Sequence, residues 1–250
     1  FPGSEELISI SAFYKYFRDP IESLNAIVPD AGTLFNFAIN QRSSTNIGVE
    51  LDFRKSLGFI SRSSNLLKRI FISGNGSFMA SEVEIDADAI QSYYLQLVAA
   101  QNSTNPLTVT GGTRKRPLVG LSPYTLNGSI SYEGRIWGIS GSYNRIGKRV
   151  IFSGLSDSTD IYENPRDVID IQVSGKFFNN KLQVKLNISD ILNQPFIQYM
   201  NNYRPNMVSG SKPPFGEADP KEYDYNKNYD KTFYIGIKGS SLSLSVSYRW

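Results

Sequence analysis

The sequence predicts an all-β fold, the wall of an antiparallel transmembrane β-barrel, from three observations. Apolar and polar residues alternate in eight stretches of strand length, so each strand has one apolar and one polar side. No apolar run approaches the length of a transmembrane helix, whereas a barrel strand needs apolar residues only at every second position. Long and short connections alternate, as in outer-membrane barrels. The predicted strands cover residues 5–17, 45–57, 69–82, 122–133, 137–152, 167–178, 181–192 and 232–250.

The first predicted strand has apolar residues at even positions from Ile8 to Tyr16. It ends before Pro20, because proline cannot donate a hydrogen bond to a β-ladder. Residues 21–44 contain Pro29 and a nearby glycine, and they are expected to form a loop.

The second predicted strand separates apolar and charged residues onto opposite faces. One face carries Ile47, Val49, Leu51 and Phe53. The other face carries the charged residues Glu50, Asp52 and Arg54. Three charges on one face are hard to bury in the dry core of a soluble sandwich, but they suit a water-filled lumen. This strand therefore favours a membrane barrel over a sandwich.

The third predicted strand is followed by a change of period. In residues 86–101, apolar residues recur at helical spacing and acidic residues stand at the start. A short helix is therefore expected inside a long loop that continues to Gly120. The helical pattern is formed by Ile90, Tyr93, Tyr94, Leu97 and Val98.

Short turns are expected after the fourth and sixth strands, at residues 133–136 and 178–180. The fifth strand loses its alternation at residues 145–149, where we expect it to leave the membrane. The polar sides of the sixth and seventh strands add three charges to the predicted lumen. These are Asp170, Lys176 and Lys185.

The last predicted strand changes the parity of its apolar positions within residues 239–241. A β-bulge would restore the register inside one long strand, and a two-residue hairpin turn is the alternative. The bulge is favoured because a ninth strand would leave an odd strand count.

Composition argues against several classes of function. The chain has no Cys and no His, so it lacks a thiolate, the usual general base and the commonest metal ligand. No nucleophile motif and no P-loop are present, so we expect neither an enzyme nor a cofactor or metal site. A scattered net charge of +3 does not indicate nucleic-acid binding.

Short segments along the whole chain resemble one family when taken in order. They are residues 11–15 (SAFYK), 19–22 (DPIE), 48–55 (GVELDFRK), 116–118 (RPL), 122–124 (SPY), 143–149 (YNRIGKR), 165–170 (PRDVID), 189–195 (SDILNQP) and the terminal Trp250. Together they resemble the C-terminal part of a TonB-dependent outer-membrane receptor of the Bacteroidetes. The resemblance implies a barrel of about 22 strands around a plug domain. This chain would supply the last eight strands, and the plug would be absent from it.

The resemblance also implies a function, the energy-coupled import of a nutrient across the bacterial outer membrane. Its implied partners are membrane lipid, the plug and remaining strands of the same receptor, and TonB through the missing N-terminal part. Whether a surface lipoprotein also sits on the loops is left open. Loop aromatics are the candidates for substrate contact, because aromatic faces suit sugars, peptides and chelates. They are Tyr93, Tyr94, Tyr199, Tyr203, Tyr223 and Tyr225.

Each group of candidate residues also has a simpler interpretation. The loop tyrosines could pack against one another or form interface girdles. The six lumen charges on the second, sixth and seventh strands could touch the plug, or they could line a wet wall as ion pairs. The resemblance further suggests that Tyr248 and Trp250 form a C-terminal assembly signal.

Two other functions are weighed against import. Eight antiparallel strands can close a small complete barrel that acts as an anchor or adhesin. Catalysis is the third hypothesis, and the missing His, Cys and nucleophile motif argue against it.

Overall fold

The long strands form one antiparallel sheet in which they follow chain order. A computed structural model describes residues 6–28, 33–61, 63–102, 115–155, 159–200, 224–228 and 230–250. The long strands of this main sheet are β1 (Leu7–Arg18), β4 (Ser43–Ser56), β5 (Ile70–Glu84), β7 (Tyr124–Glu133), β8 (Trp137–Ile146), β11 (Arg166–Phe177), β12 (Leu182–Ser189) and β15 (Ser241–Tyr248). A two-residue strand, β6 (Lys115–Arg116), pairs with the end of β5. The predicted all-β, antiparallel class is confirmed.

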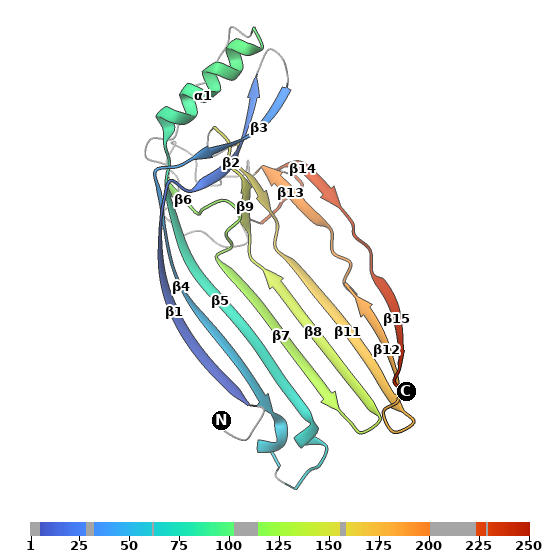
Figure 1. The fold of residues 1–250 in the computed structure, drawn as a ribbon. Coiled ribbons are helices and arrows are strands. Elements are labelled where there is room, and N and C mark those ends of the chain that lie inside the picture. The colour runs from blue at the N-terminus through green and yellow to red at the C-terminus, as the bar shows by residue number, and fades with distance from the viewer. Residues whose placement is uncertain are drawn as a thin grey trace.

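The main sheet is curved, and β1 and β15 lie at its opposite edges (Figure 1). Within the described ranges, β1 pairs only with β4 and β15 pairs only with β12. Each edge strand therefore presents a row of backbone groups that no neighbouring strand of the described chain satisfies.

The register places apolar residues of neighbouring strands side by side. Ile10 lies opposite Leu51, and Leu186 lies opposite Leu244. We call the resulting surface the apolar face. Its members on the eight strands include Ile8, Ile10, Ile47, Val49, Leu51, Ile72, Phe78, Leu126, Ile130, Ile139, Ile171, Val173, Leu186, Ile188, Leu242, Leu244 and Val246.

The opposite surface, the polar face, is joined by side-chain hydrogen bonds that cross the strands. Asn127 accepts a bond from Asn144 on β8 and donates to Asn75 on β5, the latter over 2.7 Å. Asn187 likewise accepts from Gln172 over 2.6 Å and donates to Ser243 over 3.2 Å. These ladders satisfy amides on a surface that has no second layer of side chains to pair with them.

The two ends of the main sheet differ. At the turn end, the connections are short and include the 3₁₀ turns η1 (Leu57–Phe59) and η2 (Leu67–Arg69). At the excursion end, long connections carry all the remaining strands and the helix (Figure 1).

The first excursion is a paired β-hairpin, which corrects the loop expected at 21–44. Its strands are β2 (Ile21–Val28) and β3 (Thr33–Asn40), and they pair from Ile21 opposite Asn40 to Val28 opposite Thr33. The apolar residues that it buries alternate along each strand, so the period-two signal was present in the sequence. Pro29 lies between the paired segments and does not interrupt either strand.

A second excursion sheet has the order β14–β13–β10–β9. Its strands are β9 (Arg149–Phe152), β10 (Ile161–Glu163), β13 (Phe196–Met200) and β14 (Lys231–Gly236). Strand β13 lies in a stretch expected to be loop. The strand expected at 137–152 is divided between β8 in the main sheet and β9 in this one.

The strand expected at 232–250 is likewise divided, and neither the single bulge nor the hairpin describes it. Strands β14 and β15 do not pair with each other; β14 pairs with β13, and β15 with β12. Because Ser189 lies opposite Ser241 and Phe196 lies opposite Gly236, the two neighbouring segments break at the same level. The parity switch therefore marks a change of sheet, at which Gly239 takes a φ of +83°.

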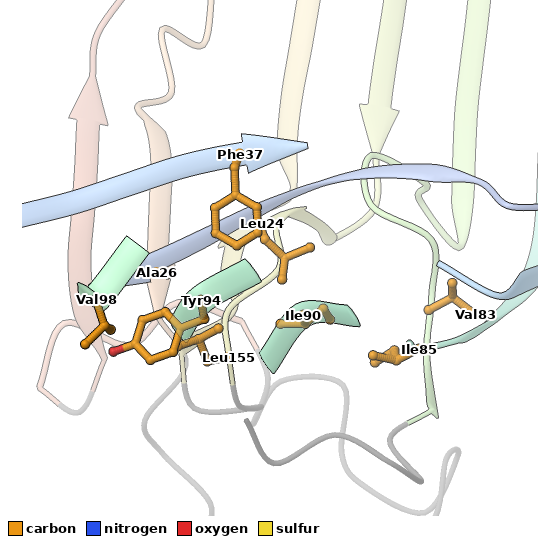
Figure 2. Close-up of a cluster of buried hydrophobic side chains, with 9 residues drawn as sticks. All are labelled: Leu24, Ala26, Phe37, Val83, Ile85, Ile90, Tyr94, Val98 and Leu155. Atoms are coloured by element: carbon orange, nitrogen blue, oxygen red, sulfur yellow. The ribbon is translucent and has the colours of Figure 1, made fainter. Parts of the chain in front are cut away.

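The predicted helix is confirmed as α1 (Ala87–Ala100), capped by the Asp86 carboxylate, which accepts a hydrogen bond from the Ala89 amide over 3.0 Å. Figure 2 shows its buried side chains meeting those of the β2–β3 hairpin. The cluster consists of Leu24, Ala26, Phe37, Val83, Ile85, Ile90, Tyr94, Val98 and Leu155. Among the described ranges, no helix has both the length and the apolar character needed to cross a membrane.

Candidate functional site

The candidate site is the excursion end around β9, β10, β13 and β14. Strand β8 enters it through Gly147, whose carbonyl oxygen accepts a hydrogen bond from the Ser122 hydroxyl over 3.1 Å. A Cβ at Gly147 would lie 2.8 Å from the ring of Tyr124, so a larger residue would push this ring away. Glycine thus allows the chain to pass from the main sheet into the second excursion sheet.

Asp167 ties three chain segments together at this junction. Its carboxylate accepts two hydrogen bonds from Arg145, over 2.7 and 2.9 Å, and one from the Tyr143 hydroxyl over 2.7 Å. Its backbone amide donates to the side chain of Gln194 over 2.9 Å. Strands β8 and β11 and the segment after β12 are therefore held at one level.

Asp190 performs the same role one strand further on. Its carboxylate accepts a hydrogen bond from Arg166 over 2.8 Å, and its carbonyl oxygen accepts one from the Ser240 hydroxyl over 2.7 Å. Gly239 donates to Asn193 over 3.1 Å. The bonds from Ser240 and Gly239 join the segment between β12 and β13 to the segment between β14 and β15.

Three tyrosines form an aromatic cluster beyond this junction. Tyr199 lies between Tyr162 and Tyr225, with ring centroids 6.0 and 5.4 Å away. The Lys148 ammonium lies 5.2 Å from the centre of the Tyr162 ring, which is a cation–π distance. Tyr162 was not among the predicted contact residues. Tyr162 precedes Glu163, which forms an ion pair with Arg149. This pairing depends on the fold, so the sequence alone did not indicate Tyr162.

A carboxyl group stands next to the aromatic cluster. Burial raises the pKa of Asp224 above its ordinary value, while the positive charges of Lys148 and Arg145 act in the opposite direction. The following residue, Tyr225, is fixed to β10's end by a hydrogen bond from its amide to Asn164 over 3.0 Å. Aromatic faces, cations and a carboxyl group are therefore gathered in one region.

The predicted contact tyrosines are found in different environments. Tyr94 and Tyr199 are fully buried, Tyr94 in the apolar cluster of α1 and the hairpin and Tyr199 beside two other tyrosines. Tyr93 is exposed and lies against Phe37, with 4.6 Å between ring centroids. Tyr225 is half-buried in the aromatic cluster, which is separate from the helix that carries Tyr93. Tyr203 and Tyr223 lie outside the described residues.

The six predicted lumen charges all lie on the polar face, but they do not form one cluster. Glu50 and Asp52 are exposed on β4, opposite Ser77 and Asn75 of β5. Arg54 approaches Glu133, with 3.6 Å between the charged atoms. The carboxylate of Asp170 accepts a hydrogen bond from the Asp190 amide over 2.8 Å.

Lys176 and Lys185 are brought together at the turn end of the polar face. They line a hollow of about 240 Å³ with Gln172, Ser174 and Gln183. The polar face thus carries charges of both signs, on β4 as well as on β11 and β12.

These arrangements offer stacking surfaces and hydrogen-bonding groups that suit the binding of a ligand. Within the described ranges, no three Asp or Glu side chains lie close enough together to hold a metal ion.

Replacing Tyr225 with leucine is expected to destabilise the edge of the second excursion sheet by about 1 kcal/mol, because the edge-on contact with Tyr199 and the hydroxyl contact with Thr232 are both lost. Faster amide hydrogen exchange in β13 and β14 would measure this change. Tyr225→Phe is the control, since it removes only the hydroxyl. Unchanged exchange in the leucine variant would show that Tyr225 does not support the sheet.

A scan against protein-family models finds no family that matches this chain, and a search of curated proteins finds no match.

Proposed function

We propose that this chain forms the C-terminal barrel wall and outer loops of a TonB-dependent receptor that imports a nutrient across the bacterial outer membrane. The observation that carries the proposal is the apolar face, which is continuous over all eight long strands. Ile10 is 71% exposed and Leu244 is 67% exposed, near opposite edges of the sheet. Soluble monomers rarely leave apolar patches larger than a few hundred Å² uncovered. In the proposed receptor, membrane lipid covers this face.

Aromatic side chains at both ends of the apolar face support this assignment. Tyr132, Trp137 and Tyr248 lie near the turn end, whereas Tyr14 and Tyr124 lie near the excursion end. From Tyr124 to Tyr132 the chain rises about 26 Å along the strand. With the usual strand tilt, this spans roughly 20 Å of bilayer, close to the apolar band of known barrels.

The polar face suits a water-filled interior that holds a plug. Its charged side chains, of both signs, on β4, β11 and β12 would contact oppositely charged groups of a plug domain. The open edges at β1 and β15 would pair with the remaining strands of the receptor. A closed small barrel would instead pair these two strands with each other, so the open sheet supports the receptor over the anchor or adhesin.

The excursion end would face the cell exterior and capture the substrate. Tyr162, Tyr225 and Lys148 offer stacking and charge in one region. The polar junction at Asp167 and Asp190 would hold this region at a fixed place above the membrane. TonB would then act on the plug, and a surface lipoprotein could cover the loops.

Growth of a strain that lacks the gene, on a panel of limiting nutrients, tests the proposal. We expect slower growth on one nutrient, restored by the wild-type gene, and uptake of that nutrient that stops when a protonophore removes the proton gradient. Normal growth on every nutrient would count against import. An intact membrane polypeptide of only 28.0 kDa would favour the small barrel instead.

Replacing Trp250 with serine is expected to lower the amount of assembled barrel several-fold, because the C-terminal aromatic is proposed to be read during assembly. The Trp250 and Tyr248 rings meet edge to face, with centroids 5.3 Å apart. Heat-modifiable migration of the membrane fraction measures assembly. Trp250→Phe, which keeps an aromatic ring, should assemble normally, and equal loss in both variants would contradict a signal based on aromatic character.

A further inference from the structure

The connection between β4 and β5 exposes large apolar side chains on its described residues. Phe59, Ile60 and Leu66 are 61%, 63% and 57% exposed. Ser56 holds the segment in place, since its hydroxyl accepts a hydrogen bond from the Gly58 amide over 3.1 Å and donates to the Lys68 carbonyl over 3.2 Å. The exposure is therefore built into a hydrogen-bonded connection.

The connection continues the apolar face. Lys55 lies opposite Ile72 in the register, on the same side of the sheet as the apolar residues of β4. Its ammonium lies 5.8 Å from the centre of the Phe59 ring. Phe59 is thus on the side of the sheet that faces lipid in the proposed function.

Cationic side chains accompany the exposed apolar ones. The stem of Lys68 lies against Gly58, because a Cβ at Gly58 would be 3.0 Å from the Lys68 Cγ. The Lys55 ammonium lies 5.8 Å from the centre of the Phe59 ring and donates a hydrogen bond to Glu6 over 2.7 Å. Exposed apolar side chains with lysines beside them match the boundary of a phospholipid leaflet, where acyl chains meet phosphates.

The other two turn-end connections repeat this combination. Exposed Ile136 follows Arg135, and exposed Phe178 precedes Lys181. A protein partner with one docking site would not require the same composition in three separate turns. A continuous lipid surface would contact all of them.

We propose that the β4–β5 connection anchors the protein to the phospholipid leaflet at the turn end. Phe59, Ile60 and Leu66 enter the region between headgroups and acyl chains, and Lys68 binds headgroup phosphates. The proposal rests on the proposed function only in taking the apolar face as the lipid-facing side.

The chain has no cysteine, so single cysteines in it can carry an environment-sensitive fluorophore. The labelled variants are Phe59→Cys, Leu244→Cys and Gln183→Cys, in the intact protein reconstituted into bilayers with lipids brominated at a shallow or a deep carbon. We expect shallow bromines to quench the label at position 59 most, and deep bromines to quench the label at position 244 most. The label at position 183, on the polar face at the turn end, should be quenched by neither.

The outcomes separate the anchor from the barrel wall. Quenching at position 244 without quenching at position 59 would overturn the anchor and leave the wall intact. Quenching at neither position would overturn the wall as well. The headgroup contact is tested by comparing bilayers of anionic phosphatidylglycerol with bilayers of phosphatidylcholine. We expect stronger quenching at position 59 in phosphatidylglycerol, and Lys68→Gln should abolish this difference. An unchanged difference would overturn the role of Lys68. Circular dichroism of each variant would verify that the sheet is folded.

Discussion

Replacing Arg116 with methionine is expected to release the β2–β3 hairpin and make it a protease substrate. Arg116 and Glu22 are 3% and 0% exposed in their side chains, and their closest charged atoms are 2.6 Å apart. The guanidinium makes a second bond to the same carboxylate over 2.8 Å. Removing one partner leaves a buried charge without its counter-charge, which costs about 3–5 kcal/mol.

The hairpin cannot absorb this loss easily, because its core is small. Leu24, Ala26 and Phe37 are its fully buried apolar residues among those described. Glu22 also accepts a hydrogen bond from the Val119 amide over 2.8 Å, so the same carboxylate fixes the chain after β6. We therefore expect local unfolding of residues 21–40 while the main sheet stays intact. Chymotrypsin cleavage at Phe35 or Phe37 on intact cells would measure it.

The double variant Glu22→Gln/Arg116→Met is the matched control. It removes both charges and keeps an oxygen that can accept from Val119, so most of the resistance to chymotrypsin should return. Arg149→Met gives a second comparison, because its pair with Glu163 is partly exposed and should matter less. A hairpin that stays resistant in the Arg116→Met variant would show that the ion pair does not hold it.

The alternation of the sequence predicted the main sheet well, because each strand repeats the same local rule. A residue on a strand faces one of two sides, and a two-sided environment imposes a period of two on every strand. The helix was predictable for a similar reason, since Ile90, Tyr94 and Val98 recur at helical spacing and all three are buried.

The excursion strands were harder to predict, because their buried sides face other excursions rather than one continuous environment. Their cores are assembled from several excursions, as the packing of Leu24 with Val83 and Leu155 illustrates. The pattern of residues within a single stretch of sequence does not indicate such contacts between distant stretches. The proline and glycine at positions 29 and 32 indicated a loop over residues 21–44, although the described residues on either side of them pair as β2 and β3.

The candidate site was predicted in its composition rather than in its arrangement. Loop tyrosines do gather, but Tyr199 is buried and serves as the centre against which Tyr162 and Tyr225 pack. The short segments that suggested a family have structural roles here. Residues 19–22 and 116–118 meet in the buried ion pair, and residues 143–149, 165–170 and 189–195 meet at the polar junction.

Replacing Leu244 with arginine is expected to reduce the folded, membrane-inserted population strongly. Leu244 lies at the middle of β15, opposite Leu186, which in turn lies opposite Val173 on β11. An arginine on the lipid face near the bilayer midplane costs about 2–4 kcal/mol. A lower urea midpoint and a smaller heat-modifiable fraction would measure the loss. Ser243→Arg is the matched control, because it adds the same side chain one residue away on the polar face, beside Asn187.

The depth of the substitution distinguishes a lipid-covered apolar face from one covered by another protein. Leu242 lies two residues nearer the excursion end, about 5 Å nearer the membrane surface, so Leu242→Arg should cost less than Leu244→Arg because its guanidinium reaches the headgroups more easily. A packed protein surface offers no such escape, so the two arginine variants would then be destabilised alike. Equal loss in Leu244→Arg and Ser243→Arg would reject the distinction between the two faces altogether. A large loss at position 244, a smaller one at position 242 and almost none at position 243 is the pattern that a lipid-facing strand produces.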